Sequence, residues 1–151
     1  MRYVTVTKER IVAAPPAEAF AFLRDYQKRP SIMPPNVSEY RVESGGQGAG
    51  TVVHYRLRAG KRERAYHLEV DETAPGRELR ERDQGSTFVT TWTLEPAEGG
   101  KKTLVRLHSQ WKGAGGIGGI FERIFAPRGL GRIYDDLLAR LDAALASPGA
   151  A

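Results

Sequence analysis

Hydrophobic and polar residues alternate along most of this chain, the pattern of β-strands that bury one face. A first alternating segment, rich in Val, Thr and Ile, covers residues 2–13 and ends before Pro15 and Pro16. Short connections between strands favour antiparallel neighbours, because a parallel crossover needs about a dozen residues or more. After the first strand, glycine-containing turns of hairpin length separate six further segments at about 38–44, 50–58, 62–73, 77–82, 86–95 and 102–111. The pattern therefore predicts one antiparallel sheet of seven strands.

Two short helical segments are predicted between the first and second strands. Residues 17–26 follow Pro16, contain good helix formers and have an apolar side. The prolines within residues 29–36 leave room for one further turn, which presents Ile32 and Met33. Both segments are therefore expected to be short.

A longer helix is predicted at the C-terminal end. Apolar residues recur at three- and four-residue steps over residues 120–146, with interruptions expected near Pro127 and Gly129. The concave face of the sheet is the surface available to cover this apolar stripe. We therefore predict an α+β domain over residues 1–147, with a curved sheet around the C-terminal helix and a disordered tail at 148–151.

Composition narrows the class of protein. The chain has 151 residues, of which 40% are hydrophobic and 27% charged, as in ordinary globular domains. No apolar run approaches the roughly 20 residues of a membrane-spanning helix, and the first residues lack the layout of a signal peptide. We therefore expect a cytoplasmic protein without integral membrane contact. The 18 acidic residues are interspersed with the 23 basic ones, so a specific nucleic-acid partner is not expected despite the net charge of +5.

Alternation assigns an unusual number of aromatic side chains to the inner face of the sheet. Amphipathic rings are common in ligand pockets, because their polar tips can hydrogen-bond while the ring stays buried. The alternative is that the rings simply fill the core. The residues expected to line a ligand cavity are Met33, Tyr55, Tyr66, Leu68, Phe88, Trp92, Ser109, Trp111, Phe121, Ile124 and Phe125.

Two charged residues fall on the same inner face near one end of the sheet. Period-two counting turns Arg64 and Glu81 inward, where an unpaired charge is unfavourable. With Tyr66 they are the candidates for an acid, a base or an orienting group. The alternative is that both charges lie at the rim of the sheet.

The sequence lacks the residues or spacings that thiolate, metal and dinucleotide sites require. The chain has no cysteine, which excludes thiolate nucleophiles, disulfides and sulfur-dependent metal sites. The three histidines, His54, His67 and His108, all alternate toward the outer face and show no local ligand spacing. Residues 113–118 match G-x-G-x-x-G, but no strand follows the next helix, so we interpret them as a flexible joint. No metal or other cofactor is expected.

The order of elements and several segments resemble the START-like (SRPBCC) superfamily, which has the helix-grip fold of polyketide cyclases and lipid-transfer proteins. The resemblance covers nearly the whole chain. It implies a deep cavity between sheet and helix, but no single reaction, because members include lipid carriers, cyclases, hormone receptors and co-chaperones. The segments that carry it are residues 11–20 (IVAAPPAEAF), 23–26 (LRDY), 91–96 (TWTLEP) and the glycine joint before the last helix.

Three functions therefore remain open at this point. The first is binding or transport of a small hydrophobic ligand by a monomer or homodimer. The second is a polyketide cyclase or dehydratase activity that uses neither a metal nor a nucleotide cofactor. The third is a co-chaperone or ribosome-associated role. The third rests on basic residues of one hairpin, Arg56, Arg58, Lys61, Arg62 and Arg64.

Overall fold

The structure is a computed structural model and describes residues 3–59, 61–112 and 127–146. Within these ranges it contains seven strands and two α-helices, with two single turns of 3-10 helix. In chain order the elements are β1 (Tyr3–Val12), α1 (Pro16–Leu23), η1 (Arg29–Ile32), β2 (Val37–Ser44), β3 (Val52–Ala59), β4 (Arg62–Ala74), β5 (Glu78–Asp83), β6 (Val89–Ala97), η2 (Glu98–Gly100), β7 (Lys102–Lys112) and α3 (Pro127–Ala146).

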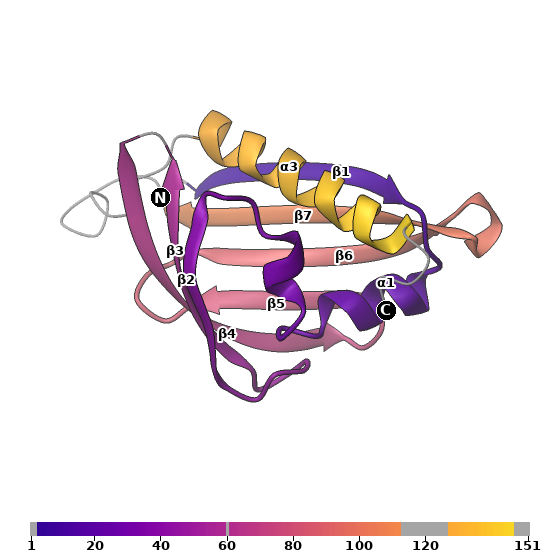
Figure 1. The fold of residues 1–151 in the computed structure, drawn as a ribbon, viewed down its shortest axis with the longest axis horizontal. Coiled ribbons are helices and arrows are strands. Elements are labelled where there is room, and N and C mark those ends of the chain that lie inside the picture. The colour runs from indigo at the N-terminus through magenta and orange to yellow at the C-terminus, as the bar shows by residue number, and fades with distance from the viewer. Residues whose placement is uncertain (1–2, 60, 113–126, 147–151) are drawn as a thin grey trace.

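The seven strands form a single antiparallel sheet in the order β1-β7-β6-β5-β4-β3-β2. Every strand from β2 to β7 pairs with its neighbour in sequence, as short connections require, and β1 closes the other edge by pairing with β7. The sheet is strongly curved, so β2 and β3 cross the view at a steep angle to β5, β6 and β7 (Figure 1). The predicted α+β fold, a curved sheet wrapped around a C-terminal helix, is confirmed.

Helix α3 lies across the concave face of the sheet, next to β1 (Figure 1). Its apolar stripe is buried there, with Leu130, Leu138 and Leu141 almost inaccessible to solvent. At its far end the Asp142 carboxylate accepts a hydrogen bond from the backbone N–H of Ala13 at 2.9 Å. The helix is thus attached to the sheet by apolar packing along its length and by a polar contact at its end.

The helix boundaries differ in part from those expected. Helix α1 ends at Leu23, three residues early, because the backbone N–H of Tyr26 donates to Gly46 of the β2–β3 loop. Helix α3 is described from Pro127 onward and continues through Gly129, so the interruption predicted near Gly129 does not occur. The expected helical residues 120–126, the glycine joint and the tail at 148–151 lie outside the described residues. No described helix has both the length and the apolar character needed to cross a membrane.

The alternation of hydrophobic and polar residues correctly predicted which side chains face the concave side of the sheet. The inward aromatic residues Tyr66, Phe88, Trp92 and Trp111 are all buried, and Tyr55 is partly buried. They form one core with α1, η1 and α3. The concave side of the sheet therefore carries the side chains from which a ligand site would be built.

Candidate functional site

A cavity lies between the concave face of the sheet, η1 and α3. It has a volume of about 40 Å³, which is room for a few water molecules. The deep cavity implied by the sequence is therefore mostly filled by the protein's own side chains. The described residues that line it are Tyr26, Arg29, Met33, Pro34, Val37, Tyr40, Val53, Tyr55, Leu57, Tyr66, Leu68, Glu81, Phe88, Thr90, Trp92, Leu107, Ile133, Tyr134 and Leu137.

A buried ion pair forms the charged part of the lining. Arg29 of η1 and Glu81 of β5 are 2% and 4% exposed, and an Arg29 Nη2 hydrogen donates to Glu81 Oε2 at 2.9 Å. The Tyr26 hydroxyl donates to the same oxygen at 2.5 Å, and Arg29 Nε donates to the carbonyl of Leu23 at 2.9 Å. Burial alone would lower the pKa of Arg29, but the Glu81 carboxylate raises it above the ordinary value. The Arg29 guanidinium therefore keeps its charge inside the protein.

The Arg29 guanidinium is also enclosed by aromatic rings. Its Cζ atom lies 4.5 Å from the ring centre of Tyr26 and 4.7 Å from that of Trp92. Such contacts stabilise a desolvated cation by about 2 kcal/mol. The cation is held in one place, which makes this part of the cavity preorganised.

Trp92 carries a buried polar atom that no described residue hydrogen-bonds. Its side chain is 1% exposed, and its indole Nε1–H has no hydrogen-bond partner among the described residues. A buried donor without a partner costs about 1–3 kcal/mol. An acceptor placed in the cavity, either a ligand oxygen or a water molecule, would remove that penalty.

A row of aromatic rings crosses the concave face from β2 to β7. The ring centres are 6.2 Å apart for Tyr40 and Tyr55, 5.4 Å for Tyr55 and Tyr66, and 5.0 Å for Tyr66 and Phe88. Phe88 in turn lies 5.7 Å from Trp111. These separations are typical of favourable aromatic pairs, so the row forms a continuous apolar wall.

The tyrosines of the cavity are held in their neutral form. Burial raises the pKa of Tyr26, Tyr40, Tyr55 and Tyr66 above the ordinary tyrosine value. Burial also raises the pKa of Tyr134 to about 12. Near neutral pH these hydroxyls can therefore donate hydrogen bonds but do not act as bases.

A hydroxyl chain connects the sheet to α3. Thr90 Oγ1 lies 2.6 Å from Ser109 Oγ, and Ser109 also bonds to the hydroxyl of Tyr134 on the helix. Thr90 and Tyr134 line the cavity, whereas Ser109 is buried behind them. Thr90 and Tyr134 therefore separate Ser109 from the cavity, and the predicted contact of Ser109 with a ligand could only be indirect.

Arg64 does not share a site with Glu81. Its Nη2 donates to Asp83 Oδ2 at 2.7 Å and to Ser86 Oγ at 2.6 Å, and its Cζ lies 4.6 Å from the Tyr66 ring centre. Arg64 is not part of the cavity lining. It instead joins β4 to the β5–β6 turn, which is the placement expected of a rim residue.

The structure brings most of the predicted ligand-binding residues together. The six among them that line the cavity are Met33, Tyr55, Tyr66, Leu68, Phe88 and Trp92. Trp111 is 3% exposed but lies behind Phe88 rather than in the lining. Phe121, Ile124 and Phe125 lie outside the described residues. Whether any of these residues contacts a ligand stays a prediction.

Sequence reasoning missed five polar residues of the lining: Tyr26, Arg29, Tyr40, Thr90 and Tyr134. Arg29 stands among prolines and Tyr26 at the end of a helical pattern, positions that usually face solvent. Tyr134 was detectable, since it lies next to Ile133 within the apolar stripe of α3. No local signal identified Arg29, because its partner Glu81 is 52 residues away.

One family model matches nearly the whole chain, and solved structures share its fold. The family model described as polyketide cyclase / dehydrase and lipid transport matches residues 3–146. The solution structure of KanY protein is 40% identical, with a TM-score of 0.84 over 97% of this chain and 100% of that one. A major latex-like protein from Panax ginseng is 11% identical, with a TM-score of 0.73 over 96% of this chain and 99% of that one. Ara h 8.0201 is 13% identical, with a TM-score of 0.64 over 97% and 100% of the two chains. No curated protein matches the chain.

Proposed function

Because the chain belongs to the polyketide cyclase/dehydrase and lipid transport family, within the START-like superfamily, we propose that its cavity binds a small hydrophobic compound that carries a hydrogen-bond acceptor. The observation that carries this proposal is the indole N–H of Trp92, which has no hydrogen-bond partner among the described residues and belongs to a lining that is apolar and aromatic apart from Arg29, Glu81 and Thr90. A carbonyl or ether oxygen of the ligand would accept that hydrogen. The rest of the ligand would lie against the rings of the aromatic wall that line the cavity, which are Tyr40, Tyr55, Tyr66 and Phe88.

The size of the cavity limits how binding can occur. A cavity of about 40 Å³ is too small for any drug-sized compound, so a ligand must displace side chains that line it. Met33, which follows η1, and Val37, the first residue of β2, both line the cavity and are only partly buried. Met33 is unbranched and adapts easily. We therefore place ligand entry between η1 and the start of β2.

Binding can be tested directly on the purified protein. Extraction with organic solvent should release any ligand that copurifies, and native mass spectrometry should then detect binding from a panel of fatty acids and polycyclic aromatic ketones. Trp92→Phe keeps an aromatic ring but removes the N–H. We expect it to weaken binding of a ketone by about 3–10-fold, the range of one hydrogen bond.

The matched control is Trp111→Phe, which changes a buried tryptophan outside the lining. It should leave the dissociation constant measured by calorimetry within about twofold of the unaltered protein, since no contact with the ligand is lost. Equal losses in the two variants would contradict the proposed contact. Absence of binding by every compound of the panel would contradict the proposed function itself.

A cyclase or dehydratase activity is the second candidate, and the buried Glu81 carboxylate favours it. A carboxylate in the cavity could remove a proton next to a ligand carbonyl, while a neutral tyrosine hydroxyl such as that of Tyr66 donates to the carbonyl oxygen. Arg29 already pairs with Glu81, so a carboxylate oxygen of Glu81 is engaged by Arg29 and less available to a ligand proton, which weakens this candidate. If turnover of a polyketide-like ketone is found, Glu81→Gln and Tyr66→Phe should each lower it at least about tenfold, or about 1.4 kcal/mol. Unchanged turnover in both variants would exclude a cyclase or dehydratase reaction that uses Glu81 and Tyr66.

The co-chaperone or ribosome-associated role has less support. It rested on five basic residues of the β3–β4 hairpin, and the structure gives two of them acidic partners. Arg56 lies 2.7 Å from Glu63, and Arg64 lies 2.7 Å from Asp83. The charge that the hairpin presents to a partner is correspondingly reduced.

A further inference from the structure

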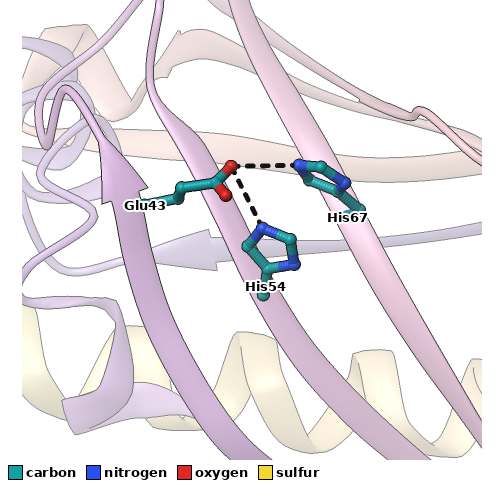
Figure 2. A group of neighbouring side chains, drawn as sticks. All are labelled: Glu43, His54 and His67. Carbon is teal, nitrogen blue, oxygen red and sulfur yellow. Dashed lines mark hydrogen bonds and ion pairs between the residues drawn. The ribbon is translucent and has the colours of Figure 1, made fainter.

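Two histidines and a glutamate meet on the outer, convex face of the sheet, away from the cavity. His54 of β3 and His67 of β4 are directly paired in the strand register, and their rings stack with centres 3.8 Å apart. Glu43 of β2 lies against both, as Figure 2 shows. The three residues come from three neighbouring strands, so the sequence shows no local ligand spacing.

A bulge in β2 places the glutamate there. The pairing of β2 with β3 shifts between Val42 and Ser44, which leaves Glu43 as an extra residue in the edge strand. Bulges re-aim side chains in this way. The carboxylate therefore reaches across to both imidazoles instead of pointing along the strand.

The distances suit a common metal ion. Glu43 Oε2 lies 3.1 Å from His54 Nε2 and 3.2 Å from His67 Nε2 (Figure 2). Ligands about 2.0–2.2 Å from a tetrahedral Zn²⁺ are separated by roughly 3.3–3.5 Å. The three ligand atoms all lie within 4.8 Å of one another. A modest rotation of the rings would therefore bring the two imidazole nitrogens to a similar separation.

The bonding of the cluster also favours a metal. The Nε2 atom of His54 is buried, lies 3.1 Å from Glu43 Oε2 and has no hydrogen-bond partner among the described residues. One anionic oxygen and two imidazole nitrogens are a typical zinc donor set.

We propose that Glu43, His54 and His67 form a three-ligand Zn²⁺ site with its fourth position open to solvent. The ion would connect β2, β3 and β4 across the outer face. It would thereby hold the irregular edge strand β2, which also supplies Val37 and Tyr40 to the cavity on the other face.

The experiment is a Zn²⁺ titration of untagged, chelator-treated protein in competition with a chromophoric chelator. We expect one equivalent of Zn²⁺ to bind per chain. The variants His54→Ala, His67→Ala and Glu43→Gln should each weaken binding by more than the roughly 10–100-fold that loss of a second-shell partner costs. All three positions lie on the solvent-facing side, and far-ultraviolet circular dichroism and urea unfolding would verify that each variant is folded.

The matched control is His108→Ala. His108 is the third outward histidine. It lies on β7, near the opposite edge of the sheet, where its ring hydrogen-bonds to Thr7 Oγ1 at 2.6 Å. Its removal should leave zinc affinity unchanged. As a second readout, Zn²⁺ should shift the imidazole NMR signals of His54 and His67 and leave those of His108 in place. Failure of the unaltered protein to bind zinc, or equal losses in all four variants, would overturn the proposal.

Discussion

Arg29 and Glu81 depend on each other for their place in the core. Each is almost inaccessible to solvent, and each would leave an uncompensated charge if its partner were removed. The Tyr26 hydroxyl and the Leu23 carbonyl satisfy further hydrogen-bonding groups of the pair. Replacement of one member is therefore a severe change at this site, whereas an exposed ion pair tolerates the same change.

We predict that Arg29→Met lowers the free energy of unfolding by about 3–5 kcal/mol, because the Glu81 carboxylate stays buried without its cation. Addition of Glu81→Gln should recover at least about 1 kcal/mol, since the neutral amide removes that charge. Arg56→Ala breaks an exposed pair with Glu63 and should cost less than about 1 kcal/mol. Urea unfolding of the four proteins measures these differences, and a loss below about 1 kcal/mol for Arg29→Met would show that the pair is not stabilising.

At the scale of elements, the loop between β2 and β3 does more than reverse the chain. Its Gly46 carbonyl accepts a hydrogen bond from Tyr26, and its Gly48 N–H donates to Arg24 at 2.8 Å. The loop thus ends α1 and fixes the start of the segment that carries Arg29. A turn predicted from its glycines alone gives no indication of this contact.

We predict that Gly45→Ala destabilises the protein by more than about 2 kcal/mol. The backbone there has φ of 71°, and an added Cβ would lie 2.8 Å from the Cα of Thr51. The left-handed conformation alone costs a non-glycine residue about 1–2 kcal/mol. Gly85→Ala is the control, because no atom lies within 4 Å of its added Cβ, and it should change stability by less than about 0.5 kcal/mol. Similar thermal midpoints for the two variants would contradict this account of the loop.

At the scale of the whole molecule, the curved sheet and α3 keep a set of tyrosines away from water. Burial raises the pKa of each described tyrosine of the cavity, including Tyr134 to about 12. A raised pKa in the folded state means that the unfolded chain loses these protons first as the pH rises. Stability from these groups is therefore complete below about pH 10 and is lost above it.

We predict that the free energy of unfolding falls as the pH rises from about 10 to 12. Each protected tyrosine contributes a slope of up to about 1.4 kcal/mol per pH unit in that window. Tyr134→Phe removes one such group and should make the slope shallower by up to that amount. Urea unfolding at several pH values measures the slope, and identical slopes for the two proteins would contradict the raised pKa of Tyr134.

Much of the fold could be predicted from local pattern. Alternation identified seven strands and turned Tyr66, Trp92 and Trp111 inward, because a residue's face in a strand depends only on its position in the alternation. The boundaries were less certain, as the early end of α1 shows, since a hydrogen bond from a distant loop decided it. Six of the eleven predicted ligand-binding residues line the cavity, and three lie outside the described residues.

Residue spacing along the chain was sufficient to predict the sheet, its inner and outer faces and the apolar stripe of the last helix. The burial of Arg29 against Glu81, the cavity volume of about 40 Å³ and the contact of Glu43 with two histidines emerged from the three-dimensional fold. Ion pairing, cavity volume and side-chain clusters depend on distances of a few ångströms between remote segments. Those distances arise from strand register, a bulge and close packing, which no local pattern encodes.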